Sequence, residues 1–201
     1  MRVKDNADRI RAMKEQNSFD ILVECLQQLP SVGRKSALRL AYALAVENKP
    51  LAARLAHCVS AAMQNVSLCA ECGGVCEDEL CEICANPLRD NGELCIVQHP
   101  KDILTLEETH FFEGRYFVVE SIDGFRLEVL RNIVQQHDIQ EIIFAFTPSV
   151  ATDALLLYVE DKLADLSLFF TKIAQGVPSG VSLENVDQIS LLRAFKGRKQ
   201  L

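Results

Sequence analysis

Long apolar segments are missing from this 201-residue sequence. No stretch approaches the roughly 18 apolar residues that a membrane-spanning helix needs, and the charged start, MRVKDNADRIRAMKEQ, lacks the apolar core of a secretory signal. The four histidines are dispersed, and none stands in a Ser/His/Asp or Cys/His arrangement typical of nucleophilic catalysis. We therefore expect a cytoplasmic protein with no membrane partner and no small-molecule substrate.

Positive charge is also scarce, since 21 lysines and arginines stand against 28 acidic residues and the net charge is −7. Taken as a whole, this balance argues against a nucleic-acid-binding protein. The distribution differs, because residues 1–68 carry ten basic and six acidic residues, whereas residues 69–201 carry 11 and 22. A basic N-terminal third on an acidic body favours a localised DNA site, although a solvated polar helix or arm at 1–16 accounts for part of the excess.

Residues 67–92 have almost no periodic apolar pattern, so burial alone cannot hold this segment folded. Five of the eight cysteines fall here, and four of them form two CxxC knuckles, Cys69/Cys72 and Cys81/Cys84, with eight residues between the pairs. Two such knuckles complete the tetrahedron of thiolates that Zn²⁺ prefers. We predict one structural zinc ion per chain, with Cys76 as a bystander.

The periodicity of apolar residues predicts an α/β multidomain fold. Helices are expected over 18–28, 34–47 and 50–66, with Ser18 as the N-cap of the first. Cys25, Cys58 and Cys95 lie in apolar settings and are expected to be small buried residues. Strands are expected over 94–98, 115–121, 141–146 and 167–173, and helices over 101–108, 125–137, 150–163 and 187–195. Alternating strands and helices predict a parallel sheet that is covered on both faces.

The segment LPSVG (29–33) joins the first two helices and is followed by Arg34 and Lys35. Gly33 allows the backbone to approach a phosphate closely, and the helix that follows offers free N–H groups and a partial positive charge. Lys35 and Arg39 share one helical face, with Arg34 at its rim. The pattern predicts a DNA-binding helix-hairpin-helix, whereas the alternative is a plain helical hairpin with basic surface residues. Val32 and Leu38 are expected to belong to the core.

Several motifs occur together in a recognisable order. They are LPSVGRKSALRLAYAL (29–44), the two knuckles followed by PLRD (87–90), LCIVQ (94–98) and the tail AQGVPSGVSLENVDQISLLRAFKGR (174–198). Together they resemble the recombination mediator protein RecR family over residues 18–198. The resemblance implies a helical region with the helix-hairpin-helix (1–66), a four-cysteine zinc finger (67–92), a Toprim-like α/β domain (93–166) and a C-terminal Walker B-like segment with a helix (167–201).

The resemblance also implies a function. RecR proteins are non-enzymatic, form ring-like homo-oligomers (dimer or tetramer) around DNA, and act with RecO, and in many cases RecF, to load RecA onto single strands. The family's DNA-contacting basic pair corresponds to Lys35 and Arg39, and its zinc ligands correspond to the four CxxC cysteines. The turn GVPSG (176–180) lacks the Lys-Ser/Thr ending of a phosphate-binding loop, so nucleotide hydrolysis does not follow. We expect this turn to be exposed and to pack against a neighbouring subunit.

The sequence departs from the family at three places. Gln98 stands where family members usually carry an acid after the first strand of the domain, Ala151-Thr152 stands where Glu-Gly is usual, and the loop 121–124 is short. These changes argue against a Toprim metal site, because Mg²⁺ chemistry needs several carboxylates and only Asp123 is left near a strand end. Two alternatives stay open: a Toprim phosphoryl-transfer enzyme, and a zinc-bearing adaptor that does not bind DNA.

Overall fold

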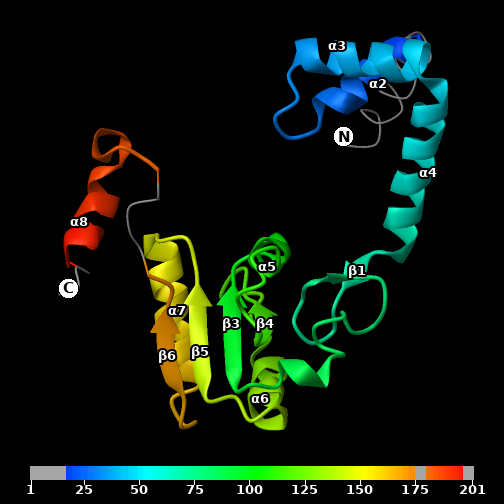
Figure 1. The fold of residues 1–201 in the computed structure, drawn as a ribbon. Helices are drawn as coiled ribbons and strands as arrows, with labels where there is room; N and C mark the ends of the chain where they lie inside the picture. The colour runs from blue at the N-terminus through cyan, green and yellow to red at the C-terminus, as the bar shows by residue number, and fades with distance from the viewer. Residues whose placement is uncertain (1–16, 175–179, 197–201) are drawn as a thin grey trace, which may run out of the picture. The chain divides into compact units, whose positions relative to one another are not determined.

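The computed structural model describes residues 17–174 and 180–196, and the chain divides into two compact units, Met1–Asn65 and Val66–Leu201 (Figure 1). The polar helix or arm expected at 1–16 and most of the turn 176–180 lie outside the described residues. The four-part domain division stays a prediction. None of the described helices is long and apolar enough to cross a bilayer.

The first unit is helical, as predicted. It contains α2 (Ser18–Gln27), α3 (Arg34–Tyr42), a π-helical turn η1 (Ala43–Glu47) and α4 (Lys49–Asn65). The N-cap of α2 is Asn17, whose side chain accepts a hydrogen bond from the Asp20 N–H at 2.9 Å. The prediction of Ser18 as N-cap is therefore wrong, because Ser18 is already the first helical residue and its neighbour supplies the capping oxygen.

The core of this unit is small. Ala37 and Ala41 are its only fully buried residues among those described. Leu38 is 52% exposed and Val32 is half-buried, so the expectation that Leu38 is a core residue is wrong for the single chain. The helical pattern alone could not decide this, because it shows where apolar residues gather but not whether a neighbouring element covers them.

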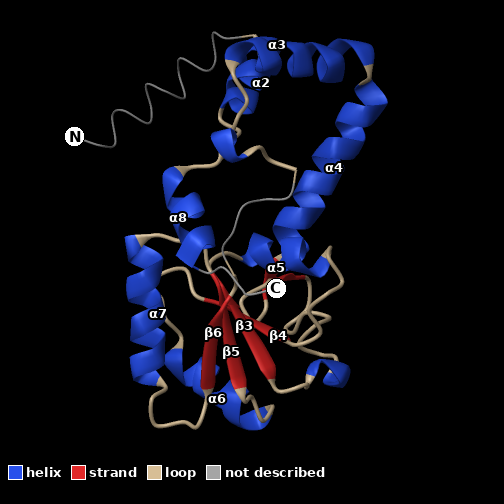
Figure 2. Cartoon of the chain, turned by 60° about the vertical axis from the view of Figure 1, so that its left-hand side comes forward, coloured by secondary structure: helices blue, strands red, loops and turns tan. Residues whose placement is uncertain are grey.

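The second unit begins with a short antiparallel pair, β1 (Ser67–Leu68) and β2 (Val75–Cys76), and the 3-10 helix η2 (Pro87–Arg89). A four-stranded sheet follows, in the order β4-β3-β5-β6, with every neighbouring pair parallel (Figure 2). Its strands are β3 (Glu93–Val97), β4 (Arg115–Val118), β5 (Glu141–Ala145) and β6 (Phe169–Lys172). Its helices are α5 (Pro100–Glu107), α6 (Leu127–Gln136) and α7 (Val150–Lys162), and η3 (Leu183–Asn185) and α8 (Gln188–Lys196) come last. The predicted parallel sheet is confirmed.

Each face of the sheet carries its own apolar cluster, because successive side chains of a strand point to opposite faces. One cluster joins Leu94, Ile96 and Phe117 of the sheet to residues of α6 and α7. The other joins Cys95, Val97 and Tyr116 to Ile103 of α5 and to the buried cysteines Cys69, Cys72 and Cys84. The cysteine segment therefore shares a hydrophobic core with the sheet rather than forming a separate lobe.

Candidate metal centre and nucleic-acid interface

The four CxxC cysteines converge on one point. The sulfurs of Cys69, Cys72, Cys81 and Cys84 all lie within 4.8 Å of one another. Three of these residues are buried and Cys81 is partly buried. In a tetrahedral zinc site with Zn–S bonds of about 2.3 Å, neighbouring sulfurs lie roughly 3.8 Å apart, and the Cys72 and Cys81 sulfurs lie 3.6 Å apart. The spacing and the soft donor set both fit one metal ion bound by four thiolates.

Backbone N–H groups orient the sulfurs. The Gly74 N–H donates to Cys72 Sγ at 3.2 Å, the Cys81 N–H to Cys69 Sγ at 3.3 Å, and the Cys84 N–H to Cys81 Sγ at 3.4 Å. These contacts stabilise negatively charged sulfur, which is the form that binds a metal. The four-thiolate set leaves no open coordination position, so the site is structural rather than catalytic.

The acidities of these thiols follow from their crowding. In the absence of a metal, hydrogen bonding with the neighbouring Cys72 and Cys84 side chains lowers the pKa of Cys81 far below its usual range. The pKa of Cys72 is raised, chiefly because its proton is held by Cys81. Metal binding displaces these shared protons, because only deprotonated sulfurs act as ligands.

The remaining cysteines lie outside this cluster. Cys76 donates from Sγ to the Asp78 carbonyl oxygen at 2.9 Å and is not one of the four converging residues. Cys95 is buried as predicted, and burial raises its pKa to about 12, so it stays an unreactive thiol. Cys25 and Cys58 are exposed in the single chain, and the prediction that they are buried is wrong. Both lie on the thinly covered helices of the first unit.

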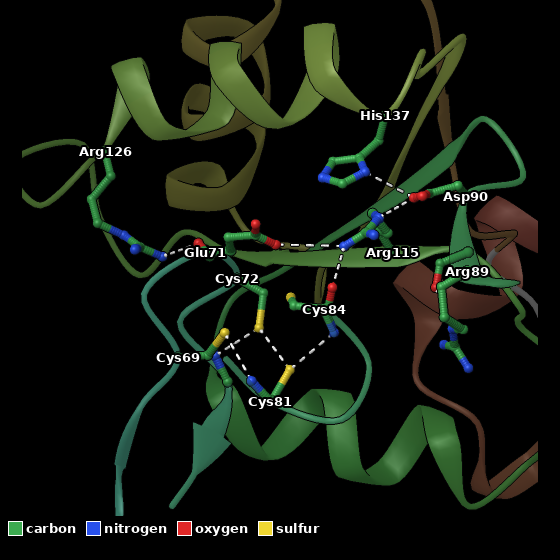
Figure 3. Close-up of polar contacts among 12 residues, drawn as sticks. Cys69, Glu71, Cys72, Cys81, Cys84, Arg89, Asp90, Arg115, Arg126 and His137 are labelled. Atoms are coloured by element: carbon green, nitrogen blue, oxygen red, sulfur yellow. Dashed lines mark hydrogen bonds and ion pairs between the residues drawn. The ribbon is translucent and has the colours of Figure 1, made fainter. Parts of the chain in front are cut away.

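A buried arginine ties the cysteine segment to the sheet. Arg115, the first residue of β4, is 3% exposed, and its Nε donates to Asp90 Oδ1. Its Nη1 donates to the Cys84 carbonyl oxygen at 3.1 Å and lies 3.5 Å from Glu71 Oε2 (Figure 3). His137 Nδ1 approaches Asp90 Oδ1 at 2.9 Å. Our sequence reasoning missed this network, although Asp90 belongs to the PLRD motif that we singled out.

The other charged residue of that motif has a similar role. Arg89 donates to Glu107 through both terminal nitrogens, at 2.6 and 3.2 Å, and from Nε to the Gly114 carbonyl oxygen at 2.9 Å. The Tyr116 hydroxyl donates to Glu107 at 2.8 Å. Desolvation, together with this hydrogen bond, raises the pKa of Tyr116. The PLRD motif therefore joins the cysteine segment to α5 and β4.

The Asp90–Arg115 pair leads to a prediction about stability. We expect Asp90→Asn to lower the free energy of unfolding by about 2 kcal/mol at neutral pH, because the buried guanidinium loses its charged partner. The hydrogen bond from Arg115 lowers the pKa of Asp90. The carboxylate therefore stabilises the fold above the unfolded pKa of about 3.9, and this contribution disappears as the pH falls through the lower folded value.

Urea unfolding of wild type and Asp90→Asn should therefore differ at neutral pH and converge once the pH falls below the lowered folded pKa of Asp90. Glu71→Gln is the matched control, because its longer contact with Arg115 predicts a smaller loss. Curves that stay equally far apart at both pH values would contradict the ion-pair explanation.

The hairpin between α2 and α3 has a defined turn. The Val32 N–H donates to the Leu29 carbonyl oxygen at 3.2 Å, Pro30 holds the second position, and Ser31 at the third has a φ of 64°. This is the pattern of a type II turn. Gly33 is the N-cap of α3, with φ of −78° and no side-chain cap. A Cβ at Gly33 would meet no atom within 4 Å, so the chain itself does not require glycine there.

The basic residues lie on the outer side of α3. Arg34, Lys35 and Arg39 are exposed, and none forms an ion pair within the described part of the chain. Residues two apart on an α-helix are separated by about 200° around its axis, so Lys35 and Arg39 lie nearly opposite the buried Ala37 and Ala41. The helix thus buries one side and presents a basic side.

The start of α3 carries positive charge, which is unfavourable for helix stability at this end. The first turns of α2, α5, α6 and α7 each contain an acidic residue, whereas those of α3, α4 and α8 have none, and α3 begins with two basic residues, Arg34 and Lys35. Acidic residues stabilise a helix N-terminus and basic ones oppose its dipole. The uncapped N–H groups and the two cations together form a positive site suited to an anion.

Acids such as Asp102, Glu120 and Asp153 lie near the carboxyl ends of the strands, but within the described residues they do not converge into a group of three or more. Gln98 follows β3 directly, Asp123 is exposed in the loop after β4, and Ala151 lies in the first turn of α7. Thr152 is buried and forms a capping box with Ser149, so it stabilises the start of α7. Within the described residues, the cysteine cluster is the only group of three or more closely placed potential metal ligands.

Comparison with known proteins gives matches in the same order as these features. Residues 19–63 match the family model of the RecR helix-hairpin-helix, residues 66–86 match that of the RecR four-cysteine zinc finger domain, and residues 176–199 match that of the RecR C-terminal region. The four cysteines therefore form the metal site of a zinc finger, which binds one zinc ion.

Whole-chain relatives carry the same name. The "Recombination protein RecR" of Helicobacter pylori (strain Shi470) is 48% identical over 90% of this chain and 94% of its own length. That of a Nitratiruptor species is 48% identical over 91% of this chain and 96% of its own length. That of Campylobacter jejuni subsp. doylei is 47% identical with the same coverage. With the hairpin, the four-cysteine site and the parallel sheet in the order that the resemblance implied, the chain belongs to the RecR family of recombination proteins and has a role in recombinational repair.

Proposed function

We propose that this protein is a non-enzymatic recombination mediator that binds DNA without sequence preference in the cytoplasm. It acts with RecO, and possibly RecF, to load RecA onto single-stranded DNA. The observation that carries the proposal is the exposed basic side of α3, where Gly33, Arg34, Lys35 and Arg39 meet at an uncapped helix N-terminus. Such contacts recognise phosphates and not bases, as a mediator of general repair requires.

Apolar surface on the first unit supports a ring-like homo-oligomer. Among the described residues its exposed large side chains are Leu29, Leu38, Leu40, Tyr42, Val46, Leu51, Leu55, Val59 and Met63. An apolar groove of about 480 Å³ lies between α2, η1 and α4, and its lining includes Leu22, Leu55, Val59 and Met63. A second copy of the chain is the occupant that we propose, because exposed apolar surface of this extent marks an interface.

The absence of catalysis is supported by the carboxyl edge of the sheet. Two-metal phosphoryl transfer needs carboxylates that hold Mg²⁺. Gln98 and Ala151 carry no charge, and among the described residues the exposed Asp123 belongs to no group of three or more closely placed metal ligands. Mg²⁺-dependent strand cleavage that is lost in Asp123→Ala would favour the phosphoryl-transfer alternative instead.

A loading assay tests the proposal. RecA filament formation is followed on single strands covered by single-strand-binding protein, with RecO present and with or without this protein. We expect the protein to shorten the lag before filament growth, and RecF is added in a second arm. An unchanged lag would contradict the mediator function. A native mass that stays monomeric with and without DNA would contradict the ring.

The second candidate function is a zinc-bearing adaptor without DNA contact, which the acidic body of the chain favours. It predicts partner binding with no salt-dependent affinity for DNA. A variant that lacks the basic side chains of α3 separates the two candidates, because only the mediator should lose affinity for DNA.

A further inference from the structure

Strand β4 lies at one end of the sheet order, so one of its sides has no neighbouring strand. Its sequence, Arg-Tyr-Phe-Val, is rich in β-forming residues, and Tyr116 and Phe117 are fully buried. An open edge of this composition is a template for pairing with another strand, and proteins usually cover such edges.

The zinc finger covers this edge. The Val118 N–H donates to the Cys72 carbonyl oxygen at 2.8 Å, so the first knuckle takes the position of a neighbouring strand. The second knuckle is held by Arg115, whose Nη1 donates to the Cys84 carbonyl oxygen at 3.1 Å. Both knuckles therefore reach β4 through backbone carbonyls.

Arg126 fixes the first knuckle in this position. It precedes α6, and it donates from Nη1 to the Ala70 carbonyl oxygen at 2.8 Å and from Nη2 to the Glu71 carbonyl oxygen at 3.0 Å (Figure 3). Its guanidinium lies 5.0 Å from the centre of the Phe117 ring. Three consecutive carbonyls, at residues 70, 71 and 72, are thereby held against β4 and the loop that follows it.

Metal binding and edge contact share the same short backbone segment. The three carbonyls belong to the knuckle formed by Cys69 and Cys72, whose sulfurs must converge on the zinc ion. Gly73 completes the bend with φ of 77°, and a Cβ there would lie 2.8 Å from Arg126 Nη2 and 3.3 Å from Val118 Cβ. Glycine at position 73 allows the knuckle to approach β4 this closely, and a bound metal would fix the path of the knuckle on its other side.

We propose that the zinc finger is a metal-dependent cap on the β4 edge, with Arg126 as the positioning residue. With zinc bound, the Cys72 carbonyl oxygen accepts the hydrogen bond of the Val118 N–H, so this N–H is not available to another strand. Without zinc, the knuckle loses its fixed path and β4 becomes available for strand pairing between copies. This role is independent of DNA binding, so it stands or falls separately from the proposed function.

Hydrogen exchange at the Val118 amide tests the cap in the full-length protein. Arg126→Met keeps an unbranched side chain of similar length but removes the guanidinium and both of its hydrogen bonds. We expect it to keep one zinc ion per chain while Val118 exchanges at least about tenfold faster, the effect of losing roughly one charge-assisted hydrogen bond. Arg131→Met is the matched control, since Arg131 contacts Asp165 and the Lys162 carbonyl oxygen instead.

Zinc removal by a chelator from the wild-type protein is the second arm. We expect faster exchange at Val118 and a rise in native particle mass, both reversed when zinc is restored. Unchanged protection of Val118 in Arg126→Met or in the chelated protein would overturn the cap. If Val118 exchanges faster but the particle mass does not rise, the zinc finger does not protect β4 from pairing between copies, and that part of the proposal is overturned.

Discussion

Cys69→Ser and Cys84→Ser are each expected to abolish zinc binding and to unfold residues 67–92. The segment has little apolar surface of its own, and three of the four ligands are buried. Structural zinc sites of this kind contribute on the order of 10 kcal/mol of apparent binding energy at neutral pH, so loss of one thiolate should lower the unfolding free energy by several kcal/mol. Elemental analysis of freshly purified protein and thermal unfolding measure the two effects.

Cys76→Ser is the matched control for that experiment. Cys76 lies outside the four converging sulfurs and donates to the Asp78 carbonyl oxygen. A serine hydroxyl can make the same hydrogen bond, so we expect this variant to keep one zinc ion and most of its stability. The ligand assignment would be wrong if Cys76→Ser released zinc or if Cys69→Ser retained a full equivalent.

Lys35→Ala combined with Arg39→Ala is expected to weaken DNA binding of any sequence strongly while the fold, zinc content and native mass stay unchanged. Both side chains are exposed on the side of α3 opposite Ala37 and Ala41. Each lost phosphate contact lowers the slope of log affinity against log salt by roughly 0.7 to 0.9, so the pair should cost at least about tenfold in affinity at moderate salt. Several copies in a ring would multiply the effect.

A salt titration of DNA affinity measures this loss, with circular dichroism and native mass as checks of the fold. Lys49→Ala with Arg54→Ala is the matched control, because it removes two exposed basic residues from α4 in the same unit. Equal losses in the two double variants would show that net charge matters and not the α3 face. An unchanged affinity and slope in the Lys35/Arg39 variant would instead favour the adaptor.

The local features could be predicted from the sequence because they depend on short-range patterns. Two CxxC pairs bring four thiolates within reach of one ion whatever surrounds them. The Pro and Gly of LPSVG end one helix and start the next, and period-two and period-3.6 patterns distinguish strands from helices. The strand β3 at Glu93–Val97 and the helix α7 at Val150–Lys162 accordingly lie within one residue of their expected ranges.

Only the tertiary structure decided what these local features contact. Exposure of Leu38 depends on whether another element covers α3, and Asn17 is the N-cap of α2 because Ser18 is already its first helical residue. The Arg115–Asp90 pair joins residues 25 positions apart, and Arg126 reaches carbonyls 55 and 56 positions away. Such contacts leave no periodic pattern in the sequence. Local chemistry therefore determined that the chain has a metal site and a hairpin, whereas the packing of distant segments determined that the metal site closes the edge of the sheet.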